Sequence, residues 1–300
     1  MGLASFEYVE PQSAQEACRC LRELPEEARL YAGGTSLLLL MKQGIVRPTH
    51  LVNLKKIQSL RFVREESSSL RIGALTTHHD LEISPVIKQH CSVISETEPQ
   101  IANIRVRSTG TVGGNLAFAE PLTDLPPIFI ALDAKVRIQG PESDRSMELE
   151  KLFTGYYETS LHPHELLVEV ELQKPSSFLG IRYLRFSSGS DKPAVGCAIA
   201  IKLDPSSGTC ADARVVLGCV APTPLRVREA EAVLAGKEFR PELAAQAAAI
   251  ASQACSPLSD IRGSESYKRS IVEVLVKRAV PEAFRRAREQ TSAAARGGKA

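Results

Sequence analysis

The sequence predicts an α+β protein of two domains, and three observations support this. The chain has 300 residues, which suggests about two domains. Short strands and helices alternate in its first half, whereas three strands precede three helices in its second half. A polar stretch, KPSSFLG at residues 174–180, separates the halves. We therefore expect domains at residues 1–175 and 180–282, followed by a flexible polar tail at residues 285–300.

Composition and charge exclude several classes of protein. Hydrophobic residues make up 43% of the chain and the formal net charge is +2, as expected for a globular protein without nucleic-acid partners. No apolar run approaches the roughly 20 residues of a membrane helix, and no export signal is evident at the N-terminus. The seven cysteines form no C-x-x-C motif, which favours reduced thiols in the cytoplasm.

The six histidines do not predict a metal site. Their only close pairs are His78–His79 and His162/His164, and no carboxylate or cysteine stands beside them at ligand spacing. We expect no metal ligands and assign the histidines to the surface or to loops.

Residues 1–57 are expected to form a small αβ subdomain. Ser13 is the predicted N-cap of its first helix, with Glu16 completing the signature of a capping box. The expected elements are strands at Phe6–Val9, Leu30–Ala32 and Thr49–Asn53 and helices at Ser13–Leu24 and Ser36–Lys42.

A glycine turn joins the second strand of this subdomain to its second helix. The turn, here called the first glycine loop, consists of Ala32, Gly33, Gly34, Thr35 and Ser36. A glycine turn that opens a helix presents unpaired N–H groups and the positive end of the helix dipole, which suits an anion. The alternative is an ordinary turn followed by an N-cap.

Residues 58–175 are expected to form a second subdomain. Its expected elements are strands at Leu60–Glu65, Ser69–Gly73, Lys135–Gln139 and Leu166–Leu172, helices at Thr76–Ile83, Pro85–His90, Val93–Gln100 and Leu149–Leu152, and a buried apolar run at Ile128–Asp133.

The second glycine loop lies within this subdomain and consists of Thr111, Val112, Gly113, Gly114 and Asn115. Its two glycines can take positive φ and leave their N–H groups uncovered, so the loop suits a phosphate. Two such loops in one domain predict a diphosphate held between them. Neither loop is a Walker A motif or the G-x-G-x-x-G of a dinucleotide fold.

The second domain is expected to be a three-stranded antiparallel sheet with helices on one face. Its strands are predicted at Ile181–Phe186, Ala194–Leu203 and Ala211–Val220 and its helices at Leu225–Leu234, Pro241–Cys255 and Glu265–Arg278. No catalytic constellation can be assembled from residue spacing anywhere in the chain, so we assign no catalytic residue. If the protein is an enzyme, a cofactor supplies the chemistry.

Several stretches together resemble one family. They are AGGTSLLLLMKQG at 32–44, RPTHLVNLKKI at 47–57, IRVRSTGTVGGNLAFAEPLTDLPP at 104–127, TPLRVREAEAVLAGK at 223–237 and DIRGSESYKRSIVEVLVKR at 260–278. The chain resembles the FAD-binding medium subunits of molybdenum hydroxylases. It is most similar to the carbon monoxide dehydrogenase branch, and xanthine dehydrogenase carries a related FAD domain.

The resemblance implies a two-part FAD domain of the vanillyl-alcohol oxidase type, then a smaller α+β domain. The FAD diphosphate would lie between the two glycine loops. Asp124 would accept a hydroxyl proton from the ribose or ribityl chain, unless it is an Asx-type cap before two prolines. Leu167 would make a main-chain contact to FAD, unless it is a core residue. Arg185 stands near the flavin end, where many members carry Lys. Tyr183 is either a flavin neighbour or a core residue.

The resemblance also implies a division of labour between subunits. A large subunit would oxidise substrate at a molybdenum cofactor, and a small subunit with two [2Fe–2S] clusters would pass the electrons to FAD in this chain. An external acceptor such as NAD⁺, oxygen or a quinone would then receive them. Two alternatives stay open here: a self-contained flavin reductase of the same fold, and a non-flavin scaffold that keeps the glycine loops as turns.

Overall fold

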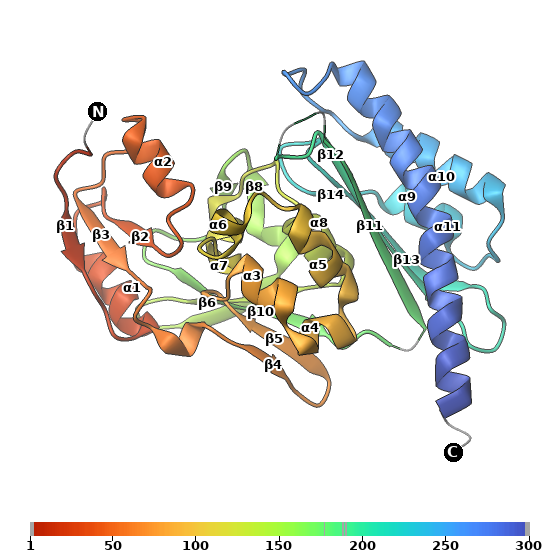
Figure 1. The fold of residues 1–300 in the computed structure, drawn as a ribbon, viewed down its shortest axis with the longest axis horizontal. Helices are drawn as coiled ribbons and strands as arrows, with labels where there is room; N and C mark the ends of the chain where they lie inside the picture. The colour runs from red at the N-terminus through yellow and green to blue at the C-terminus, as the bar shows by residue number, and fades with distance from the viewer. Residues whose placement is uncertain (1–2, 177, 188, 190, 298–300) are drawn as a thin grey trace. The chain divides into compact units, whose positions relative to one another are not determined.

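A computed structural model describes residues 3–176, 178–187, 189 and 191–297. The chain divides into two compact units, which Figure 1 shows in colours that follow the sequence. The first unit combines residues 1–120 and 134–173, and the second combines residues 121–133 and 174–300. The chain therefore leaves the first unit after Glu120 and returns to it at Ala134.

The first unit begins with a three-stranded parallel sheet of order β1-β3-β2. Helix α1 packs against it, and the Ser13 hydroxyl accepts the Glu16 N–H at 3.1 Å, as an N-cap does. Ala17 and Cys18 of α1 are fully buried in the core of this region. The elements are β1 (Glu7–Val9), α1 (Ala14–Glu23), β2 (Arg29–Tyr31), α2 (Leu37–Lys42) and β3 (His50–Asn53).

A five-stranded antiparallel sheet of order β4-β5-β10-β6-β7 makes up the rest of the first unit, together with a cluster of short helices. Its strands are β4 (Val63–Glu65), β5 (Ser69–Gly73), β6 (Lys135–Gln139), β7 (Asp144–Glu148) and β10 (Leu166–Gln173), and a separate hairpin joins β8 (Phe153–Gly155) to β9 (Glu158–Thr159). Its helices are η1 (Gln58–Leu60), α3 (His78–Ile83), α4 (Pro85–His90), α5 (Ser92–Thr97), η2 (Glu98–Gln100), α6 (Ile104–Arg107), α7 (Val112–Phe118) and η3 (Leu149–Leu152).

The second unit contains a four-stranded antiparallel sheet of order β11-β12-β13-β14, so the expectation of three strands is wrong. The extra strand, β14, covers only Leu225 and Arg226, which pair with Leu217 and Val216. We had expected a helix from Leu225, but helix α9 begins at Arg228. Two residues are too few for a strand pattern to be visible in a sequence. The other strands are β11 (Leu179–Phe186), β12 (Val195–Leu203) and β13 (Cys210–Gly218).

Helices cover both faces of this sheet, whereas one covered face was expected. Alternate residues of β12, including Cys197 and Ile199, join the main core beneath α9 (Arg228–Leu234), α10 (Pro241–Ala254) and α11 (Glu265–Gly297). Helix α8 (Leu125–Ala131) lies against the opposite side. Pro127 of α8 lies close to Gly218 of β13, because a Cβ added to Gly218 would be 3.0 Å from Cγ of Pro127.

Helix α11 also includes most of the segment expected as a tail, because it continues to Gly297. The flexibility of residues 285–297 stays a prediction, and residues 298–300 lie outside the described part of the chain. Among the helices that the structure describes, none combines the length and the hydropathy that a transmembrane span requires.

Candidate functional site

The first glycine loop connects β2 to α2 and presents a row of unpaired amides. The backbone N–H groups from Gly33 to Leu37 donate to no other group among the described residues. Gly34 has φ +78, which glycine adopts without strain, and its carbonyl accepts the N–H of Leu38 at 3.0 Å. Ser36 is the N-cap of α2, but its hydroxyl makes no capping bond. The loop therefore offers several N–H donors to an anion.

The second glycine loop lies at the start of α7 and behaves differently. Gly113 and Gly114 belong to the first turn of α7, so the expected positive φ and uncovered N–H groups are wrong. These amides instead donate to carbonyl groups in residues 74–77 and to the N-cap residue Thr111. The bonds are Val112 N–H to Thr76 O (2.9 Å), Gly113 N–H to Ala74 O (2.8 Å), Gly114 N–H to Thr111 Oγ1 (3.1 Å) and Asn115 N–H to Thr111 O (2.8 Å).

The two loops meet at the residues that precede the second one. A Cβ placed on Gly33 would lie 2.3 Å from the carbonyl oxygen of Thr109 and 2.9 Å from Cα of Gly110. A Cβ placed on Gly110 would lie 3.6 Å from Oγ1 of Thr35. Glycine at position 33 is therefore what lets the first loop rest directly on backbone 109–110. Neither Thr109 nor Gly110 was among the expected site residues, although Gly110 opens the glycine-rich stretch GTVGGN whose backbone was expected to approach something closely.

Asn115 contributes an unsatisfied polar atom to the same region. Its Oδ1 is buried and has no hydrogen-bond partner among the described residues. A buried amide oxygen without a partner is costly, which points to a ligand donor that the protein chain itself does not supply.

Leu167 lies on β10 in the first unit and is 2% exposed, so its side chain belongs to the core. The pairing of β10 with β6 shifts register between Leu167 and Glu169. Such an irregularity takes backbone groups out of the regular ladder, which is compatible with a main-chain contact at this position.

Asp124 and Arg185 come together in the second unit. The hydroxyl of Tyr183 donates to Asp124 Oδ1 at 2.8 Å, and Nε of Arg185 lies 3.4 Å from the same oxygen. Burial, followed by the charge of Asp124, raises the pKa of Tyr183 well above its ordinary value, so its phenol keeps the proton that it donates. Asp124 makes no side-chain capping bond to α8, which argues against the Asx-type cap. Tyr183 is buried, as a core residue is.

Comparisons with known proteins identify the chain. Residues 4–175 match the family described as the FAD binding domain in molybdopterin dehydrogenase, and residues 183–283 match the carbon monoxide dehydrogenase flavoprotein C-terminal domain. The first match alone spans more than half of the chain. This chain belongs to that family of FAD-binding flavoproteins.

Relatives of this FAD-binding flavoprotein align over nearly the whole chain. The medium chain of carbon monoxide dehydrogenase from Hydrogenophaga pseudoflava is 36% identical over 94% of this chain and 98% of its own. Subunit alpha of the 6-hydroxypseudooxynicotine dehydrogenase complex of Paenarthrobacter nicotinovorans is 33% identical over 95% of this chain and 96% of its own.

Solved structures agree with these relatives. The structure of the Hydrogenophaga pseudoflava carbon monoxide dehydrogenase matches with a TM-score of 0.92, covering 95% of this chain and 99% of that one. Quinoline 2-oxidoreductase from Pseudomonas putida 86 matches with a TM-score of 0.89 at 29% identity, covering 96% of this chain and 99% of that one. The mixed α/β fold with a C-terminal flavoprotein domain is confirmed, and the chain is an oxidoreductase flavoprotein subunit. The self-contained reductase and the scaffold are not favoured.

The residues present fit the FAD that this family binds. Unpaired amides at Gly33 to Leu37 can donate to the diphosphate, and the orphaned Oδ1 of Asn115 can accept from a hydroxyl or amino group. This arrangement depends on Gly33, whose missing Cβ leaves room for the backbone of Thr109 and Gly110. We call this contact between Gly33 and residues 109–110 the joint between the loops. Both loops were expected from the sequence, but the amide donors expected in the second are used in hydrogen bonds within the protein.

Proposed function

We propose that this chain is the electron-relay subunit of a molybdenum hydroxylase complex, with the FAD diphosphate bound by the amides of the first glycine loop. The N–H groups from Gly33 to Leu37, which have no acceptor within the described part of the chain, carry this proposal. In this proposal the first glycine loop, Ala32 to Ser36, lies against the diphosphate and supplies the hydrogen-bond donors. The second glycine loop, Thr111 to Asn115, supports the first loop, and the side-chain Oδ1 of Asn115 accepts a hydrogen bond from the cofactor.

The other residues have separate roles. The backbone at Leu167 contacts the cofactor beside the irregularity in β10. Asp124, fixed by the Tyr183 hydroxyl, accepts a hydrogen bond from a hydroxyl of the ribose or ribityl chain. Arg185 contributes its positive charge toward the flavin, and its Nη2 is held by the carbonyl of Asp191 at 2.7 Å. FAD itself supplies a redox centre that exchanges electrons singly or in pairs.

The partners follow from the family. We propose a large subunit that holds the molybdenum cofactor and a small subunit that holds two [2Fe–2S] clusters, with electrons passing from those clusters through this chain to an outside acceptor. Relatives named for carbon monoxide and for a nicotine derivative are similar to this chain over nearly its whole length, so we assign substrate choice to the large subunit. We also propose a cytoplasmic location, domains at residues 1–175 and 180–282 and, within the described residues, a flexible tail at 285–297.

Flavin content tests the proposal first. The purified chain should show the visible absorption bands of a flavin, and heat denaturation should release FAD into the supernatant. Stripped protein should take up added FAD. A colourless chain that takes up none would refute cofactor binding.

The relay itself needs the native complex. The chain should co-purify with a molybdenum subunit and an iron–sulfur subunit from its source. In that complex the flavin absorbance should bleach when substrate is added without an acceptor, and it should return when an acceptor is supplied. Bleaching by substrate in the isolated chain would instead indicate a self-contained enzyme.

A further inference from the structure

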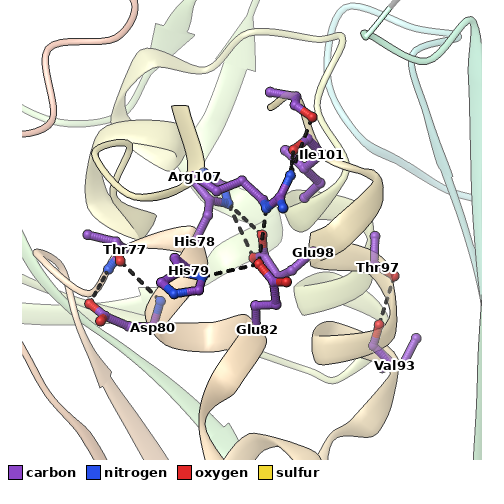
Figure 2. A network of polar contacts seen from close by, with 11 residues as sticks. Thr77, His78, His79, Asp80, Glu82, Val93, Thr97, Glu98, Ile101 and Arg107 are labelled. Carbon is purple, nitrogen blue, oxygen red and sulfur yellow. Dashed lines mark hydrogen bonds and ion pairs between the residues drawn. The ribbon is translucent and has the colours of Figure 1, made fainter. Parts of the chain in front are cut away.

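A buried histidine–carboxylate pair lies behind the glycine loops. Nδ1 of His78, at the start of α3, lies 3.0 and 3.2 Å from the two carboxylate oxygens of Glu98 (Figure 2). His78 is 5% exposed and Glu98 is fully buried, so the expectation of surface histidines is wrong at position 78. Enclosing an ionisable pair in the core is costly in folding free energy, and such pairs often fix a local geometry.

The backbone around His78 pairs with the backbone that precedes the second glycine loop. The His78 N–H donates to the carbonyl of Gly110 at 3.1 Å, and Thr77 forms an isolated antiparallel bridge with Thr111. Together with the bonds to Ala74 and Thr76 described above, these contacts hold residues 110–113 against residues 74–78.

The ring of His78 reaches the same place. A Cβ added to Gly110 would lie 3.3 Å from Cδ2 of His78, while Gly33 of the first loop rests on the same glycine. The imidazole therefore stands between the buried carboxylate of Glu98 and the joint on which the first loop rests. Its orientation is set by the bond from Nδ1 to Glu98.

We propose that His78, oriented by Glu98, is a positioning residue that fixes the joint between the two glycine loops and thereby the amides that bind the FAD diphosphate. This inference rests on the proposed function. Amide donors must be held in place before the ligand arrives to bind it tightly, because ordering them on binding reduces affinity. The first loop has few hydrogen bonds of its own, so the joint is what keeps it in place.

The neighbouring residue provides a matched control. Nδ1 of His79 lies 3.3 Å from Oε2 of Glu82, on the same helix, and Glu82 also pairs with Arg107 at 3.0 Å (Figure 2). This pair is partly exposed, and neither His79 nor Glu82 is among the nearest atoms to a Cβ built at Gly33 or Gly110. It has the same chemistry as the buried pair but lies outside the joint.

Replacing the pair with apolar residues separates positioning from stability. Removing His78 alone would take the imidazole away from the buried Glu98 carboxylate, so the test uses the double variant His78→Leu/Glu98→Met, which removes both polar groups together. Glu98→Gln serves as a milder second variant, because it keeps a hydrogen-bond acceptor for the ring. His79→Leu is the control. Each apoprotein is titrated with FAD and with ADP, and its free energy of unfolding is measured in urea.

The double variant should unfold near the wild-type denaturant midpoint but bind FAD about tenfold more weakly, with a similar loss for ADP, because ADP carries the same diphosphate. Glu98→Gln should show a smaller loss and His79→Leu none. Unchanged affinity for both ligands in a folded double variant would overturn the inference. If the double variant does not fold, unchanged affinity in Glu98→Gln would do so. Wild-type protein that binds no FAD would refute the proposed function instead.

Discussion

At the first glycine loop and the first residue of α2, the amides from Gly33 to Leu37 donate to no described group, whereas in the second loop the amides from Val112 to Asn115 all donate within the first unit. Both loops carry adjacent glycines, and the sequence alone predicted the same phosphate nest for each. We therefore call the first loop the donor loop and propose that the second supports it. Adjacent glycines indicate close backbone approach, but they do not say whether a ligand or the protein itself makes that approach.

The glycines differ between the loops in the same way. Gly34 is needed for its positive φ and Gly33 for contact with the other loop, whereas Gly113 is needed for packing against Ala74. Substitutions at these positions should accordingly separate into losses of FAD affinity and losses of stability.

Gly33→Ala should have the largest effect, because the new Cβ would meet the Thr109 carbonyl oxygen at 2.3 Å, and backbone rather than a flexible side chain must shift to make room. Overpacking of this kind costs about 1–3 kcal/mol, and here it displaces the donor loop, so we expect FAD affinity to fall by about 100-fold. Quenching of flavin fluorescence on titration of apoprotein measures this. An affinity within threefold of wild type would contradict the role of the joint.

Gly113→Ala should mainly reduce stability. Its Cβ would lie 2.6 Å from Cβ of Ala74 and 2.9 Å from the Ala74 carbonyl oxygen, so the free energy of unfolding should fall by about 2 kcal/mol. Urea denaturation of the apoprotein measures the change, and FAD affinity should fall less than in Gly33→Ala. Adding Ala74→Gly should restore part of the stability. A full loss of FAD binding in a stable Gly113→Ala protein would make the second loop a donor loop as well.

Gly34→Ala places a Cβ in a left-handed conformation, which costs about 1–2 kcal/mol, and the ring of Tyr31 must also move. FAD affinity should fall about tenfold. Gly208→Ala is the matched control, since Gly208 has φ +72 with nothing within 4 Å of the added Cβ. It should lower stability without changing FAD affinity. Equal affinity losses in both variants would assign the effect to general strain.

Thr111→Val should have the smallest effect. It removes the hydroxyl that accepts the Gly114 N–H while keeping the side-chain shape, and losing such an N-cap costs about 1 kcal/mol of stability. Thermal unfolding should show a lowered Tm that Thr111→Ser restores. Because no amide of the donor loop is involved, FAD affinity should stay within threefold, and a larger change would mean that Thr111 contacts the cofactor.

Local signals predicted much of the fold. Ser13 caps its helix as its spacing with Glu16 indicated, and the strands on either side of the first glycine loop lie where their apolar residues placed them. The prediction was wrong for β14, whose two residues form a strand only because they meet β13. Most of helix α8 was expected as an apolar run of the first domain, yet it belongs to the second unit through contacts with residues some 90 positions later.

The sequence by itself determined the kind of protein and the places where its backbone comes close to something, because glycine pairs, caps and apolar periodicity act over a few residues. Only the tertiary structure decided which amides stay unpaired. The hydrogen-bond acceptors of the second loop, Ala74 and Thr76, lie nearly 40 residues upstream. The residue that packs against Gly110 is His78, which Glu98 orients. A hydrogen-bond donor is free or occupied according to what the fold brings to it, and this depends on contacts that no short stretch of sequence contains.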